Sequence, residues 1–204
     1  MNLEDERLLV AKEAARLLYY RLATEYKFAK LRAARELGVN VLPSNREVAE
    51  QLDLLADLLE GESRVKRLVE MRRAALRIMR VLSDFSPRLI GSVWRGTVRV
   101  GSDIDIIVYA DSPSIIVEKL KSNGFSISFV ERKVKVYSDT GVKKIYTHIH
   151  ISLPQGFKAE IVVREPEDIH IEETCDIYGD VIKGLTISEL EEILVRDPAR
   201  KFVP

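Results

Sequence analysis

LIGSVWRGTVRVGSDIDIIVYA, residues 89–110, places two aspartates in an apolar run shortly after a Gly-Ser pair. Alternate residues of a β-strand point to the same face, so Asp103 and Asp105 would project together, opposite the apolar Ile104 and Ile106. Two neighbouring carboxylates repel each other, and a bound cation removes that repulsion. Oxygen ligands on a rigid strand favour Mg²⁺, with Mn²⁺ as the alternative, and such ions also bind phosphate oxygens.

A third carboxylate is expected where two such ions act together. Ions held about 3.5–4 Å apart stabilise both the attacking and the leaving oxygen of an in-line displacement. Glu160 lies in the apolar stretch FKAEIVV, residues 157–163, where an ordinary core strand would not carry an acid. We therefore predict that Asp103, Asp105 and Glu160 form one metal-binding and catalytic group.

The Gly-Ser pair indicates a phosphate-binding turn. Gly91 and Ser92 follow the short strand RLI and open a stretch that suits a helix, whose first backbone N–H groups favour an anion. Arg95 and Arg99 would add charge-assisted donors for a triphosphate. Ser102, directly before the first aspartate, completes the predicted nucleotide-binding residues.

These residues closely resemble the signature of the polymerase β-like nucleotidyltransferases, in particular small archaeal and bacterial members: Gly91-Ser92, ten intervening residues, then Asp103-Ile104-Asp105-Ile106. The resemblance covers roughly residues 87–165. It implies that Gly91 and Ser92 hold the β- and γ-phosphates of a nucleoside triphosphate (NTP) and that the two aspartates bind two magnesium ions. It also implies that Glu160 ligates the catalytic ion and helps to activate the acceptor hydroxyl, although most of the family has aspartate there.

The implied activity is transfer of a nucleoside monophosphate from an NTP to a hydroxyl, with release of pyrophosphate. The acceptor is left open between RNA, a protein, a small molecule and a second nucleotide. One alternative is a non-catalytic nucleotide-binding partner or oligomerisation module of the toxin–antitoxin type. Another is a nucleic-acid-binding protein, which the net charge of zero disfavours. An exposed edge strand with solvated aspartates is disfavoured by the isoleucines around them.

The fold class that these patterns predict is α+β: a helical N-terminal region, residues 1–86, and a nucleotidyltransferase core with a mixed β-sheet flanked by helices, residues 87–204. Apolar periodicity predicts helices over residues 8–37, 45–60 and 63–85. Ser44 and Glu47 form a capping box for the second helix. The third helix carries a basic face that we interpret as solvent-exposed, with a nucleic-acid footprint as the alternative. A homo-oligomer or a protein partner would use these N-terminal helices.

The core is expected to continue with a helix over residues 112–124, strands over 125–138, 143–153 and 158–165, and a final helix over 188–197. Turns are expected at DTG, residues 139–141, and at PQG, residues 154–156. A three-residue PQG loop would place His150 opposite Glu160, and Ser152 opposite Lys158. His148, His150 and Lys158 would then be candidate substrate contacts, whereas a two-residue loop would turn the histidines away.

Composition indicates where the protein is located and what kind of organism it comes from, but not which reaction it catalyses. The chain has 204 residues, and no apolar run approaches the roughly 20 residues that a membrane-spanning helix needs. Cys175 is the only cysteine, so no internal disulfide forms and a cytoplasmic location is expected. Glutamine and asparagine number only two and four, a bias typical of proteins from hot environments.

Overall fold

The computed structural model describes residues 2–137 and 141–204, which form two compact units. The helical unit comprises Met1–Arg64, Thr174–Val181 and Val203–Pro204. The sheet unit comprises Val65–Glu173 and Ile182–Phe202. Ser138 and most of the expected DTG turn lie outside the described residues. No helix in the described part of the chain is long and apolar enough to cross a bilayer.

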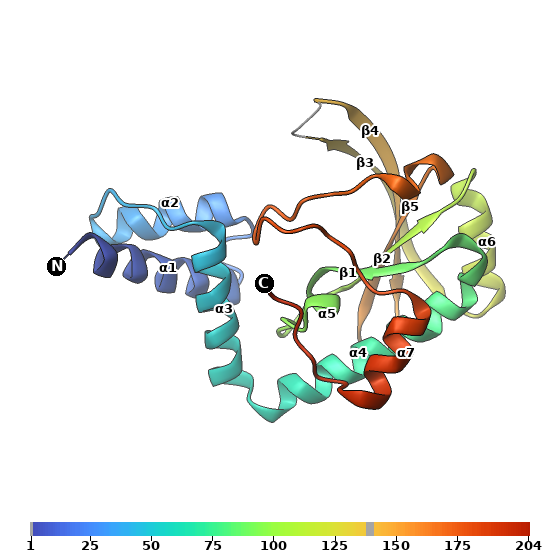
Figure 1. Cartoon of the computed structure of the whole chain (residues 1–204), viewed down its shortest axis with the longest axis horizontal. Helices are drawn as coiled ribbons and strands as arrows, with labels where there is room; N and C mark the ends of the chain where they lie inside the picture. Colours follow the sequence, from blue (N-terminus) through green and yellow to red (C-terminus); the bar gives the residue numbers. More distant parts are fainter. Residues whose placement is uncertain (1, 138–140) are drawn as a thin grey trace. The chain divides into compact units, whose positions relative to one another are not determined.

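The helical unit contains α1 (Leu3–Tyr19), α2 (Tyr26–Leu37) and α3 (Asn45–Glu60), and Figure 1 shows them in blue and cyan. Its core is built from the apolar stripes of the three helices, with Val10, Leu17, Ala29, Ala33 and Val48 fully buried. The capping box predicted at Ser44 and Glu47 is present at the start of α3.

The single helix expected over residues 8–37 is wrong, because the chain reverses between α1 and α2. Arg21 adopts a left-handed conformation with φ of 57°. The backbone N–H groups of Leu22 and Ala23 both donate to the carbonyl of Leu17, at 2.8 and 3.2 Å, and close the turn. Apolar residues of both helices are buried in one core. Neither glycine nor proline lies between the helices, so the apolar pattern of the sequence continues across the turn without interruption.

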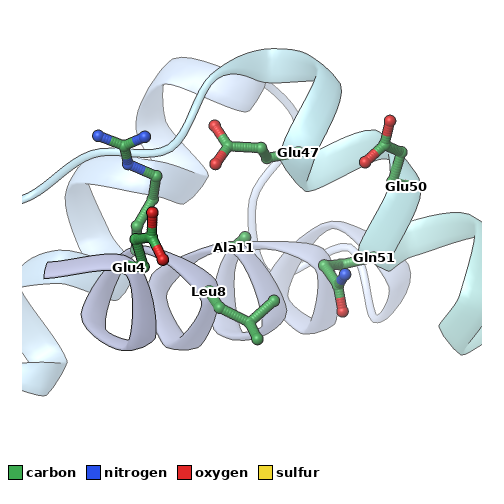
Figure 2. A pocket seen from close by; sticks show the side chains of 7 residues that line it. Glu4, Leu8, Ala11, Glu47, Glu50 and Gln51 are labelled. Carbon is green, nitrogen blue, oxygen red and sulfur yellow. The ribbon is translucent and has the colours of Figure 1, made fainter. Parts of the chain in front are cut away.

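A pocket of about 290 Å³ opens between α1 and α3 (Figure 2). The side chains around it are mostly polar and include three glutamates: Glu4, Arg7, Leu8, Ala11, Glu47, Glu50 and Gln51. This pocket belongs to the helical unit, whereas the predicted catalytic acids belong to the sheet unit.

The sheet unit has five strands: β1 (Arg88–Ile90), β2 (Ile104–Tyr109), β3 (Ser126–Val136), β4 (Lys143–Ser152) and β5 (Lys158–Arg164). Their order is β1-β2-β5-β4-β3. The pair β2–β5 is parallel, and the pairs β1–β2, β4–β5 and β3–β4 are antiparallel. The sheet is therefore mixed, as predicted.

The helices of this unit are α4 (Glu62–Val81), α5 (Gly91–Arg95), α6 (Pro113–Ser122) and α7 (Ile187–Arg196), with 3₁₀ turns at Ser83–Phe85 and Pro166–His170. Apolar residues of α4, α6 and α7 pack with one face of the sheet, where Ile104, Ile106, Ile149 and Ile161 are fully buried (Figure 1). The opposite face, which we call the open face, carries Asp105 and Glu160, and farther along the strands Ile107, Tyr146 and Val162 form a smaller buried cluster on it.

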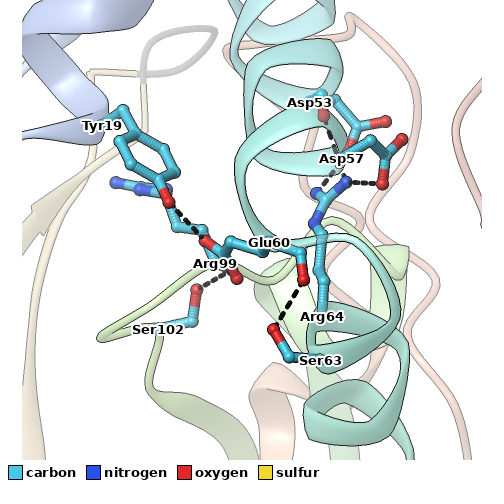
Figure 3. Close-up of polar contacts among 8 residues, drawn as sticks. All are labelled: Tyr19, Asp53, Asp57, Glu60, Ser63, Arg64, Arg99 and Ser102. Carbon is cyan, nitrogen blue, oxygen red and sulfur yellow. Dashed lines mark hydrogen bonds and ion pairs between the residues drawn. The ribbon is translucent and has the colours of Figure 1, made fainter.

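The domain boundary expected at residue 86 stays a prediction. Helix α4 lies before that boundary in sequence. Leu68, Met71 and Ile78 of α4 pack in the core of the sheet unit, although the helix precedes residue 86. Two arginines of its expected basic face are buried, which corrects the solvent-exposed interpretation for those positions. Arg64 pairs with Asp53 and Asp57 of α3 (Figure 3), and Arg72 is enclosed in the sheet unit.

Candidate active site

The two central strands bring Asp105 and Glu160 together on the open face. Asp105 of β2 is in register with Glu160 of β5 and with Ile90 of β1. Asp103 lies just before β2, two residues from Asp105, and is exposed, whereas Asp105 is partly buried. Because residues paired in register on adjacent strands share a face, Asp105 and Glu160 lie on the same side of the sheet, and Asp103 is close enough for its charge to raise the pKa of Asp105.

Gly91 packs directly against Asp105. The turn after β1 gives Gly91 a φ of +68°, and a Cβ added there would lie 2.1 Å from Oδ2 of Asp105. No other residue fits this position without moving the carboxylate, because every other side chain begins with a Cβ. Helix α5 begins at Gly91, so the Gly-Ser pair and Asp105 form one compact element, with Ser92 partly buried beside it.

The electrostatic state of the acids favours a cation. Burial, followed by the negative charges of Glu160 and Asp103, raises the pKa of Asp105 to about 7. Near neutral pH this carboxyl is therefore about half protonated without a cation. A divalent ion on the open face would bind the ionised form and remove the repulsion.

Glu160 is held in its charged form by neighbours from two strands. Lys133 of β3 donates to Oε1 of Glu160 at 2.9 Å, and Nδ1 of His148 lies 2.7 Å from the same oxygen. Burial alone would raise the pKa of Glu160, but the hydrogen bonds from Lys133 and His148 outweigh it and lower that pKa. Lys133 also contacts Glu131 at 3.0 Å.

The PQG turn forms a three-residue loop, in which Leu153 donates to the carbonyl of Phe157 at 2.8 Å. The conditional prediction is therefore confirmed: His150 pairs with Glu160, and Ser152 with Lys158. His148 and His150 both lie on the open face and are partly buried. Lys158 shares this face near the beginning of β5 and is exposed.

A second group of metal-ligating atoms lies beside the three acids. One ligand atom each from Glu131, His150 and Glu160 can be found within 4.8 Å of one another. The ammonium of Lys133 is hydrogen-bonded to both of these glutamates and already supplies positive charge to them. The sequence alone does not identify Glu131 and Lys133. The one signal for them is the two-residue alternation of β3, which places both side chains on the face that carries the β4 histidines.

The predicted phosphate donors are placed differently from one another. Arg95 is buried, donates to the carbonyl of Phe202 at 2.9 Å and lies 4.2 Å from the ring of Trp94. These contacts hold the guanidinium in the protein interior. We therefore correct the expectation that Arg95 reaches a triphosphate. The backbone N–H of Arg99 donates to Oγ of Ser102 at 3.0 Å (Figure 3), which shapes the turn before Asp103.

Arg72 of α4 holds helix α5 in place through hydrogen bonds to its backbone. The sequence predicts instead that the basic face of α4 is solvent-exposed. The guanidinium of Arg72 donates to the carbonyls of Val93 and Trp94, at 3.1 and 2.9 Å, and to those of Pro198 and Arg200, both at 2.8 Å. Burial lowers the pKa of Arg72 to about 10, which leaves the group charged at neutral pH. The Gly-Ser turn is thus held on one side by Arg72 and on the other by Asp105.

Residues 72–169 match the family model described as a nucleotidyltransferase domain. The match confirms the family predicted for this part of the chain, and the mixed five-stranded sheet with its helices confirms the α+β fold. Comparison with curated proteins gave no match.

Among solved structures, the chain is similar to Cid1 in complex with the UTP analogue UMPNPP, with 22% identity, a TM-score of 0.34, and coverage of 52% of this chain and 30% of that chain. A cytoplasmic RNA terminal U-transferase gives 17% identity, a TM-score of 0.34, and coverage of 62% and 36%. The GLD-2/RNP-8 complex gives 13% identity, a TM-score of 0.30, and coverage of 51% and 34%. The matched part therefore spans well under half of each of those chains.

Proposed function

With residues 72–169 belonging to the nucleotidyltransferase domain family, we propose that this protein transfers a nucleoside monophosphate from an NTP to a hydroxyl acceptor. The observation that carries the proposal is the register of Asp105 with Glu160, with Gly91 packed against the Asp105 carboxylate. In the reaction, the acceptor oxygen bonds to the α-phosphorus while the bond from that phosphorus to the pyrophosphate oxygen breaks. The hydroxyl proton passes to the Glu160 carboxylate, and pyrophosphate leaves.

The residues present suit a divalent metal. The donors are carboxylate oxygens on adjacent strands, the ligand type that Mg²⁺ and Mn²⁺ favour, and the raised pKa of Asp105 reflects the cost of leaving these acids without a cation. Asp103, Asp105 and Glu160 would hold the ions, which would neutralise charge on the phosphates. We assign Mg²⁺ as the cofactor and Mn²⁺ as its substitute.

The other residues of the site bind and orient. Gly91 and Ser92 would offer backbone N–H groups and a hydroxyl to the phosphates, and Ser102 and Arg99 shape the turn that leads to Asp103. Lys133 and His148 keep Glu160 ionised and fix its direction. Catalysis would then consist of positioning and charge stabilisation, with no covalent intermediate on the protein.

The location and the partners of the protein are also part of the proposal. A single cysteine suits the cytoplasm, and the N-terminal helices offer a surface for a second copy or a protein partner. The non-catalytic nucleotide-binding module remains the second candidate, because Lys133 already neutralises Glu160 without a metal.

Incubation with each α-labelled NTP and Mg²⁺ or Mn²⁺, with and without RNA or cell lysate, tests the proposal through pyrophosphate release and label transfer. Asp105→Asn and Glu160→Gln should each lose turnover. Asp111→Asn, an exposed aspartate just beyond β2, is the matched control and should retain it. Full turnover in Asp105→Asn would refute the mechanism, and NTP binding without turnover in every mixture would favour the non-catalytic module.

A further inference from the structure

One row of residues crosses the open face from the proposed catalytic acids to the edge of the sheet. Strand pairing places Asp105 beside Glu160, Glu160 beside His150, and His150 beside Phe129 of the edge strand β3. Neighbouring strands lie about 4.8 Å apart, so Phe129 stands about 10 Å from Glu160 along this row. An aromatic side chain therefore lies two strands from the acid assigned to the acceptor hydroxyl.

Phe129 and His150 form a stacked pair. Their ring centroids are 4.0 Å apart and their planes differ by 13°. His150 is held in place by Glu131, whose Oε1 lies 2.9 Å from its Nε2. Phe129 nevertheless remains 53% exposed. One side of the phenyl ring is thus supported by a fixed imidazole, while much of the ring surface stays open to a ligand.

We infer that Phe129 and His150 form an acceptor subsite that stacks a nucleobase, so that the acceptor is the 3′ end of a single-stranded oligonucleotide. The inference rests on the proposed function, because Glu160 marks where the acceptor hydroxyl would lie. A flat aromatic surface binds planar rings through stacking and tolerates any base.

The distance along the row favours an oligonucleotide over a single nucleotide. Nε2 of His150 lies 3.5 Å from Oε1 of Glu160, so a base stacked on the outer side of Phe129 is separated from that oxygen by two stacked rings. The stacked base therefore belongs to a nucleotide that precedes the reacting one.

The basic residues of the β3–β4 hairpin leave few phosphate contacts beside Phe129. The two strands of the hairpin carry five basic side chains and one acidic one, although the whole chain is neutral. Lys133, Lys135 and Lys144 share the alternation phase of Phe129 and His150 but form ion pairs with nearby acids. Arg132 and Lys143 are exposed but lie in the opposite phase. With so few phosphate contacts, stacking would supply most of the affinity, and salt would weaken binding only slightly.

Fluorescence of a short single-stranded RNA with 2-aminopurine as its penultimate base tests the subsite, with neither NTP nor metal present. Stacking on Phe129 should quench the probe. Phe129→Leu should weaken binding about 5- to 100-fold, and Phe129→Tyr, which keeps a flat ring, should bind like the wild type. Val134→Leu is the matched control, since Val134 is 60% exposed on the same strand but in the opposite alternation phase.

The outcomes separate the subsite from the catalytic proposal. Quenching that depends on Phe129, in the wild type and in Asp105→Asn alike, supports the subsite even where turnover is absent. Quenching that persists in Phe129→Leu, or no quenching in the wild type, overturns it. Equal quenching by free 2-aminopurine ribonucleotide overturns the oligonucleotide assignment. In turnover assays, label on a protein or an amino sugar, with none on RNA, overturns the proposed acceptor while leaving nucleotidyl transfer intact.

Discussion

Replacing Gly91 with alanine would separate backbone strain from damage to the site. Gly91 has a φ of +68°, and the new methyl carbon would lie 2.1 Å from Oδ2 of Asp105. Gly124, which follows α6, has a φ of +82° and nothing within 4 Å of an added Cβ. Gly124→Ala therefore carries the same backbone strain without the collision, and it serves as the matched control.

The magnitudes follow from these two geometries. A left-handed alanine costs about 1–2 kcal/mol, so both variants should lose about that much free energy of unfolding. In Gly91→Ala the methyl group and the carboxylate must also separate by at least 0.9 Å to reach the 3.0 Å below which real Cβ contacts essentially never fall. A displacement of about 1 Å in a catalytic group costs about 100-fold in rate.

Urea unfolding and label transfer from an α-labelled NTP measure the two effects separately. Gly124→Ala should lose stability and keep its transfer rate, whereas Gly91→Ala should lose more stability and about 100-fold in rate. In an Asp105→Ala background the carboxylate is absent. There, Gly91→Ala should cost little more free energy of unfolding than the left-handed backbone strain alone. An identical cost of Gly91→Ala in both backgrounds would show that the close approach to Asp105 is not what requires glycine.

Three other substitutions test the structure by urea unfolding. Arg72→Met should cost about 3–5 kcal/mol, since four carbonyls lose a buried charged donor, whereas the exposed neighbour Arg73→Met should change stability by less than about 0.5 kcal/mol; equal costs would contradict the anchoring role. The raised pKa of Asp105 means that, without metal, the folded chain binds a proton more tightly than the unfolded chain between about pH 4 and 7. The free energy of unfolding should therefore fall as pH rises through that window, by at most about 4 kcal/mol, and Asp105→Asn should flatten the fall; an unchanged profile would refute the assignment. Arg21→Gly should raise stability by up to about 1 kcal/mol, because φ of 57° strains arginine but not glycine, and a loss would contradict the turn between α1 and α2.

Local pattern was sufficient wherever a single strand or turn carries the information. The two-residue alternation of Asp103 and Asp105 predicted one acidic face, and the Gly-Ser pair predicted a turn that opens a helix, where α5 begins. The short PQG loop limited the pairing of β4 with β5 to two registers and named the contact of His150 with Glu160 as one of them. Each of these depends on neighbours only a few residues apart in sequence, where backbone geometry leaves few choices.

Tertiary structure decided which distant side chains meet. The reversal at Arg21 is invisible to periodicity, because α1 and α2 contribute one continuous apolar pattern to a shared core. An arginine is normally solvated, so sequence predicts an exposed Arg72 and a phosphate-binding Arg95. Both side chains are instead enclosed and bonded to backbone carbonyls. Lys133 and Phe129 entered the site only through the pairing of β3 with β4, which includes a bulge between Ile127 and Phe129. Sequence encodes the period of each element, but long-range packing fixes register and determines which charged groups can be buried, because only there do their partners become available.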